Sequence, residues 1–246
     1  MKAAAALQGR LLVVQGHDTA LRQLDHKLQT MPAKAELASS QVAVVEAAEA
    51  VAGAKVRVSD IQRELTAVED EVTKVEQRRR RDTDRLESGG GTSREIQALV
   101  AEVEALERRR DVLEEAQLEV MERLEEAGIA LGQLEQALAQ NQAKVAELIE
   151  VVAAESAQIE AEQAEQRTAR DQAALGLGED LMALYERLRE RQNGVGAAAL
   201  IQRRCDGCRL EVTPAHLAEI RAAAEDDVVR CEECGRILVR GEDSGQ

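Results

Sequence analysis

Four cysteines near the end of the chain are the residues whose type and spacing point most directly to chemistry. They are the only cysteines among 246 residues and form two Cys-X-X-Cys pairs, Cys205 with Cys208 and Cys231 with Cys234. Each pair places two sulfurs on a tight turn, and two pairs supply the four tetrahedral thiolates that Zn²⁺ prefers. The sequence therefore predicts one structural Zn²⁺ held by these four residues, with no coordination position left for a reacting water.

Redox chemistry is the main alternative for a Cys-X-X-Cys pair. It is disfavoured because no thioredoxin-like alternation of strands and helices surrounds either pair, and because one metal ion explains both pairs together. His216 lies between the pairs, but the cysteine set is complete without it, so we expect His216 at the surface of a small helix. The sequence contains no Ser/His/Asp set, phosphate-binding loop or dinucleotide fingerprint. We therefore predict no catalytic residues, no organic cofactor and no enzymatic activity.

The residues around the cysteines predict a small α+β ribbon. Gly207 and Gly235 occupy the two cysteine turns, where positive φ angles are needed. Aliphatic residues at 210–212, 228–229 and 237–239 predict short strands. Thr213-Pro214 has the order of an N-cap followed by a first helical residue, which predicts a small helix through Ile220. Asn193-Gly194 and Gly196 are turn residues and are interpreted as a linker that precedes the ribbon.

The composition of the whole chain predicts long helices. Phe and Trp are absent, Tyr185 is the only aromatic residue, Pro occurs twice and 32% of the residues are charged. Such a chain buries a narrow apolar seam against another helix. The net charge of −15 argues against nucleic acid or an anionic membrane as the default ligand. With no 18-residue apolar run and no signal-peptide pattern, we expect a cytoplasmic protein that does not enter a membrane.

Apolar residues at alternating spacings of three and four predict two helical arms with coiled-coil seams. The first seam contains Leu21, Leu24, Leu28, Met31, Val58, Ile61, Leu65, Val68, Val72, Val75 and Leu86. Its middle is assigned to Val42, Val45 and Ala52, with a slip in phase near residues 56–58. The second seam contains Ile96, Leu99, Val103, Leu106, Leu113, Val120, Leu124, Leu131, Leu134, Leu138, Val145, Leu148, Val152 and Ile159, with polar positions at Arg110, Gln117, Asn141 and Glu155.

Residues 88–92, which include three consecutive glycines, join the two arms and predict an antiparallel hairpin. Thr92 and Glu95 have the spacing of a capping box, whereas Met31-Pro32 should interrupt the first arm. Gly53 then falls opposite residue 127, beside Gly128, and we expect a soft point there. We predict a mainly α fold, in which residues 1–178 form a long antiparallel coiled-coil hairpin with its tip at 88–92. Residues 179–246 should form a short helix at about 179–191, a linker and the C4 zinc ribbon.

The chain resembles the bacterial C4-type zinc ribbon family, in which a long helical hairpin precedes a small ribbon. The resemblance rests on Leu24-Asp25 with Met31-Pro32, on residues 95–99 and on the closing segment Cys231 to Leu238. It implies a non-enzymatic protein whose hairpin or ribbon engages other proteins. In some members these partners belong to flagellar or type III export or include an alternative sigma factor. The family's metal ligands correspond to Cys205, Cys208, Cys231 and Cys234.

Two functional hypotheses follow. The first is a zinc-binding adaptor or chaperone-like protein that acts through protein–protein interactions as a monomer or weak dimer. The second is a nucleic-acid-associated factor that touches RNA or DNA through the ribbon or through the arginine-rich tip. That tip contains Arg78 to Arg81, Arg85 and Arg94, but neighbouring acids favour ordinary ion pairs on a solvated helix. Nucleic acid is therefore the less favoured partner, and the sequence does not name the protein partner.

Overall fold

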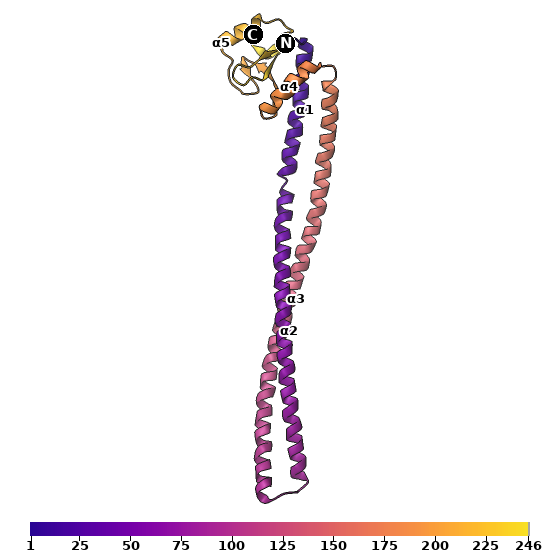
Figure 1. Ribbon diagram of the computed structural model, residues 1–246, viewed down its shortest axis with the longest axis vertical. Coiled ribbons are helices and arrows are strands. Elements are labelled where there is room, and N and C mark those ends of the chain that lie inside the picture. Colours follow the sequence, from indigo (N-terminus) through magenta and orange to yellow (C-terminus); the bar gives the residue numbers. More distant parts are fainter. Residues whose placement is uncertain (246) are drawn as a thin grey trace. The chain divides into compact units, whose positions relative to one another are not determined.

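The computed structural model describes residues 1–245 and confirms a mainly helical chain with a small strand-containing end. Four helices come first: α1 (Ala5–Gln29), α2 (Pro32–Glu87), α3 (Ser93–Ala174) and α4 (Glu179–Arg191). Helices α2 and α3 run antiparallel, joined by the turn at 88–92 (Figure 1). The predicted break at Met31-Pro32 separates α1 from α2. Gln246, the last residue of the predicted second segment, lies outside the described residues.

The turn at the hairpin tip carries the predicted capping box. The Thr92 amide donates to Glu95 Oε2 at 2.7 Å, and the Glu95 amide donates to Thr92 Oγ1 at 3.4 Å. These reciprocal bonds satisfy donors that the first turn of a helix leaves free. They fix the start of α3.

Contacts divide the chain into two compact units, one formed by residues 35–149 and the other by residues 1–34 with the residues from 150 onward. Within residues 35–149, Ile61, Leu65 and Val120 form a buried cluster with Leu124 and Ala127 packed against it. Gly53 and Ala127 line the same groove, as the predicted pairing requires. The soft point there, and the predicted division of the chain at residue 178, stay predictions.

The predicted middle of the first seam is wrong. Val42 and Val45 are 57% and 58% exposed. The half-buried and buried residues of this stretch, which face α3, are Ala43, Val44, Ala47 and Val51. These positions continue to Ala54 and Val58 at spacings of three and four, so the predicted phase slip does not occur. On α3, Glu155 is exposed and Ser156 is half-buried in its place, whereas Arg110, Gln117 and Asn141 occupy the seam as predicted.

The unit that contains the ribbon is built on a four-stranded sheet with the order β2-β1-β4-β3. Its strands are β1 (Ala197–Ile201), β2 (Arg204–Cys205), β3 (Val229–Arg230) and β4 (Ile237–Arg240). Strand β1 is parallel to β4, and the outer pairs are antiparallel. Residues 192–196 form a turn and irregular backbone, in agreement with a linker at 193–196, and β1 follows directly at a place where no strand was predicted. The strand expected at 210–212 is reduced to an isolated bridge between Arg204 and Glu211.

The sheet separates two apolar cores, because successive side chains of a strand point to opposite faces. Ala197, Ile237 and Val239 face a core that contains residues of α1 and α4. Ala198, Leu200 and Leu238 face the other core, which holds the cysteines and α5 (Pro214–Ala222). Helix α5 begins at the predicted N-cap, where Thr213 accepts a hydrogen bond from the His216 amide. A short 3-10 helix, η1 (Glu242–Ser244), follows the last strand.

Candidate metal centre

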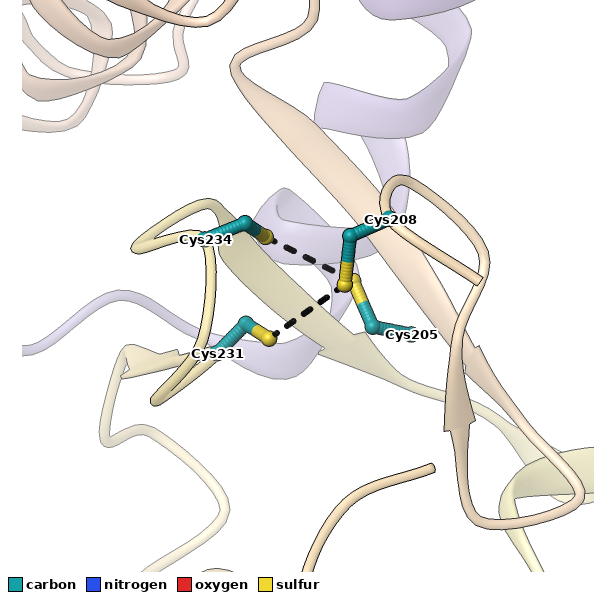
Figure 2. Close-up of side chains that lie close together, drawn as sticks. All are labelled: Cys205, Cys208, Cys231 and Cys234. Carbon is teal, nitrogen blue, oxygen red and sulfur yellow. Dashed lines mark hydrogen bonds between the residues drawn. The ribbon is translucent and has the colours of Figure 1, made fainter. Parts of the chain in front are cut away.

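The four cysteine sulfurs converge on one point between the two turns (Figure 2). All four sulfur atoms lie within 4.8 Å of one another, with Cys205 to Cys234 and Cys208 to Cys231 both at 3.9 Å. These separations are much longer than a disulfide bond of about 2.05 Å. They match the sulfur–sulfur distance of about 3.8 Å that follows from a tetrahedron with Zn–S bonds of about 2.3 Å. The donor set therefore fits one Zn²⁺ ion.

The two cysteine turns have the same backbone hydrogen bonds. In the first, the Arg209 amide donates to the Cys205 carbonyl at 2.7 Å, and the Cys205 amide donates to the Leu210 carbonyl at 3.0 Å. In the second, the Gly235 amide donates to the Cys231 carbonyl at 2.8 Å, and the Cys231 amide donates to the Arg236 carbonyl at 2.9 Å. Each turn thus presents two sulfurs from one side, which is why two such turns enclose one ion.

The residue after each second cysteine has a left-handed backbone. Gly235 has a φ of 71° and Arg209 has a φ of 62°. The expectation that Gly207 needs positive φ is wrong, because its role is close packing. A Cβ at Gly207 would lie 2.7 Å from Arg236 Cδ and 3.0 Å from Ala198 Cβ. The absence of a side chain at Gly207 therefore allows the first cysteine turn to pack closely against Ala198 of β1 and against Arg236, which follows the second cysteine turn.

Burial and amide hydrogen bonds shift the pKa values of the cysteine thiols in opposite directions. Burial raises the pKa of Cys205 and of Cys231 above the ordinary thiol value, although two amides of each turn donate to the first sulfur and oppose this rise. Burial also acts against the Cys234 thiolate, but backbone and side-chain hydrogen bonds lower its pKa to about 7. A bound cation favours the thiolate form of all its ligands. The centre thus combines a negative donor set with amides directed at sulfur.

His216 is not part of the sulfur cluster. Its side chain is 19% exposed, and Nε2 lies 2.9 Å from the Arg230 carbonyl while Nδ1 lies 3.1 Å from Glu219 Oε2. Burial lowers the pKa of His216, but these two acceptors outweigh burial and raise it overall. The residue links α5 to β3 instead of projecting freely from the surface.

Two arginines that the sequence reasoning did not select hold the ribbon together. Arg240 donates to the carbonyls of Ile220 and Ala223 at 3.2 and 3.1 Å, which are acceptors at the end of α5. Arg236 donates to the Val195 and Gln192 carbonyls, both at 3.0 Å, and so connects the second cysteine turn to the end of α4. Sequence offers no direct signal for such roles, because the acceptors are backbone atoms far along the chain.

Tyr185 of α4 lies in the core formed by α1, α4 and the sheet. It is fully buried, and its hydroxyl donates to Asp18 Oδ2 at 2.6 Å. Arg170 donates to Asp18 Oδ1 at 2.9 Å and also pairs with Glu186. Burial and the Asp18 carboxylate raise the pKa of Tyr185 well above its ordinary value. Asp18 was not recognised in the sequence, where it is one acid among many on a helical arm.

Of the six arginines near the hairpin tip, Arg78 and Arg79 form ion pairs with acids of residues 1–245, in line with a solvated helix. Arg78 pairs with Glu102 across the hairpin and lies 4.0 Å from Asp82 on its own helix. Arg79 lies 3.7 Å from Glu107. Among the described residues, no helix has the length and apolar character required to cross a bilayer.

Comparisons with known proteins agree with this architecture. Residues 14–193 match the CT398-like coiled coil hairpin domain, and residues 204–238 match the C4-type zinc ribbon domain. The second match, together with the cluster of four sulfurs, identifies the centre as a site for one structural Zn²⁺. The assignment of each individual cysteine as a ligand stays a prediction.

Relatives with similar architecture occur in mycobacteria and Chlamydia. An uncharacterized protein of Mycobacterium tuberculosis is 34% identical over 242 residues, which cover 98% of both chains. A solved structure from Mycobacterium smegmatis is 31% identical with a TM-score of 0.86, and the match covers 98% of this chain and 100% of that one. The structure of CT398 from Chlamydia trachomatis is 20% identical with a TM-score of 0.69, and covers 96% and 98% of the two chains. This last likeness concerns the fold alone.

Proposed function

This chain belongs to the family of CT398-like coiled-coil hairpin domains, here followed by a C4-type zinc ribbon, and from that membership we propose that it is an adaptor protein. It binds zinc for structure and acts through protein–protein contacts of its coiled coil and ribbon. Both matched domains are structural, and neither indicates an enzymatic family. A closed set of four thiolates supports this proposal, because it leaves no open coordination position for catalysis.

The observation that carries the proposal is a second apolar stripe on α2. It consists of Val42, Val45, Ala52 and Val56 and is called the outer stripe below. The three valines are 57%, 58% and 61% exposed, although their intervals of three, seven and four are those of a coiled-coil seam. Because α2 already buries another seam against α3, the outer stripe is free to receive a further helix. We therefore propose an amphipathic helix of a partner protein as its ligand.

A groove in the same segment supports helix docking. It has a volume of ≈ 580 Å³, and half of its lining residues are small, namely Ala50, Gly53, Ala54, Ala127 and Ala130. Gly53 has open space where a Cβ would lie. Small side chains allow another helix to approach the backbone closely, so the groove can receive larger side chains from a partner.

Site-specific photo-crosslinking tests the proposal. A crosslinking residue at Val45 should capture a distinct partner in the native cell extract, whereas the same residue at Glu46, exposed on a neighbouring face of α2, should capture much less. The double variant Val45→Glu with Val56→Glu should bind the captured partner at least about tenfold more weakly, because two buried charges are unpaired in the complex. Equal capture at positions 45 and 46, or unchanged affinity of the double variant, would contradict docking at the outer stripe.

A salt titration with generic RNA and DNA separates this function from nucleic-acid binding. The adaptor proposal predicts little binding even at low salt, because the chain has a net charge of −15 and Arg78 and Arg79 face acids. Steep salt-dependent affinity would favour the nucleic-acid alternative. A variant without the ribbon, compared with the intact protein, would show which region makes the contact.

A further inference from the structure

A cleft lined with arginines lies in the unit that contains the ribbon, away from the sulfur cluster. It has a volume of ≈ 350 Å³ and is lined by residues of α1, α3, α4 and the turn after α4. Its charged residues are Arg22, Arg167, Arg170, Arg189, Asp18 and Asp25. Four cations and two acids line the cleft, and Glu186, which pairs with Arg170 and Arg189, leaves one excess positive charge on a chain whose net charge is −15. We refer to it as the arginine cleft.

The acids of the arginine cleft are already engaged. The side chain of Asp18 is 4% exposed and accepts hydrogen bonds from the Tyr185 hydroxyl and from Arg170. Asp25 Oδ1 accepts from Gln163 Nε2 at 2.6 Å. The carboxylates are therefore held by groups of the protein, and Asp18 forms part of the buried floor.

Donors of the arginines remain available. Arg189 engages Glu186 through Nε and one terminal nitrogen, at 2.8 and 2.7 Å, and its Nε lies 3.7 Å from Asp18 Oδ2, which leaves its other terminal nitrogen available. Arg167 is exposed and has no ion-pair or hydrogen-bond partner among residues 1–245. A guanidinium group carries five N–H donors in a planar fork that fits the oxygens of a phosphoryl or carboxylate group. The cleft therefore has more donors than the protein itself satisfies.

The turn after α4 is shaped to receive Arg22. Arg22 donates to the Asn193 carbonyl, and its Cζ lies where a Cβ on Gly194 would approach to 3.1 Å. Gly194 has a φ of +83°, which disfavours other residues for a second reason. The Gly194 carbonyl accepts from Gln15 Nε2 at 3.0 Å, which ties this turn to α1. The position of Arg22 at the rim is thus fixed by the backbone of the turn.

From this arrangement we infer that the arginine cleft binds a small molecule that carries a phosphoryl group. The volume falls in the lower part of the range of about 300–1,000 Å³ that is usual for small-ligand sites. Arg22, Arg167 and Arg189 come from three different helices and can surround one doubly charged group. This inference is independent of the adaptor function, because none of these residues belongs to the outer stripe.

Calorimetric titration of the zinc-loaded, full-length protein with inorganic phosphate and pyrophosphate tests the inference. At low ionic strength we expect saturable binding of one ligand per chain. Arg167→Gln and Arg22→Gln should each weaken it at least about tenfold. Arg187→Gln is the matched control, because Arg187 is an exposed residue of α4 that does not line the cleft. It should leave the affinity unchanged.

A gain of affinity provides a second readout that a change in folding would not produce. Asp25→Asn removes one negative charge from the cleft and keeps an oxygen that can accept from Gln163, so phosphate should bind about two- to fivefold more tightly. Circular dichroism of each variant checks that the helices are intact. Absence of saturable binding at about 10 mM phosphate, or equal affinity of the Arg167 and Arg187 variants, would overturn the inference.

Discussion

The two compact units bury their apolar residues in different ways. In the ribbon-containing unit, Tyr185, Ile237 and Leu238 are 0% exposed, and the sheet has a packed core on each face. In residues 35–149, Leu124, Leu131 and many other seam residues remain half-buried. Two helices cover each other along one line, whereas a sheet between helices is covered on both faces. The same types of apolar side chain therefore contribute less to the free energy of unfolding, per residue, in the hairpin than in the ribbon-containing unit.

This difference shows what each unit requires for stability. The hairpin spreads its stabilisation over a long, repetitive seam, so no single residue is decisive. The ribbon is short and has two-residue strands, and a segment of this size usually needs a metal or a disulfide to fold. Zinc binding thus stabilises the ribbon, whereas the hairpin is stabilised by the length of its seam.

Loss of zinc should separate the two units most clearly. We expect Cys231→Ser to release the ion and unfold the residues after about 197, because zinc binding in such sites contributes about 10–16 kcal/mol to folding. Helicity of residues 35–149 should be largely retained. Metal content, circular dichroism at 222 nm and limited proteolysis measure the three expectations. Full zinc content in the variant, or loss of most of the helical signal, would contradict this account.

Removal of a buried charge should be the next largest effect. Asp18→Ala leaves Arg170 and the Tyr185 hydroxyl without their buried acceptor and should destabilise the ribbon-containing unit by about 3–5 kcal/mol. Amide hydrogen exchange should then accelerate in α1 and α4, with little change in residues 61–65 and 113–124. Tyr185→Phe, which removes one hydrogen bond and keeps the ring, should cost only about 1 kcal/mol. Similar losses for the two variants would argue against a charged network.

Equivalent truncations in the two units compare them directly. Leu238→Ala should cost about 3 kcal/mol, because Leu238 is fully buried and leaves a cavity. Leu124→Ala in the half-buried seam should cost about 1–2 kcal/mol, because water already reaches part of its surface. Chemical denaturation with site-specific probes in each unit measures both values. Equal costs would show that the seam packs as tightly as the ribbon core.

The same contrast explains which features could be predicted from the sequence. Local signals were reliable: Pro32 starts a helix, Thr92 and Glu95 form a capping box, and the four cysteines converge. The prediction of a seam through Val42 and Val45 is wrong because hydrophobic pattern favours the larger valines over the small alanines as buried positions. In the structure, Ala43 and Ala47 lie against the partner helix and the valines face outward.

Features that depend on distant parts of the chain could not be predicted. Residues 197–201 read Ala-Ala-Ala-Leu-Ile, which has no strand signal of its own, and β1 exists because it pairs with β4. Likewise, Asp18 meets Tyr185 and Arg170 only once α1, α3 and α4 come together. The four arginines of the arginine cleft come from α1, α3 and α4, so no local stretch of sequence predicts that they lie together.

The smallest predicted effect compares the two cysteine turns themselves. Arg209 and Gly235 hold equivalent positions with φ angles of 62° and 71°, but a side chain in this conformation costs about 1–2 kcal/mol. Part of that gain is offset in Arg209→Gly by the greater freedom of glycine in the unfolded chain, about 0.4–1 kcal/mol. We therefore expect a net stabilisation of about 0.5–1 kcal/mol. Gly235→Ala should destabilise by a similar amount or more, because its Cβ would also approach Arg230 Nη2 to 3.1 Å. Thermal unfolding of the zinc-loaded ribbon measures both, and a loss of stability in Arg209→Gly would show that the arginine side chain contributes contacts that outweigh its backbone strain.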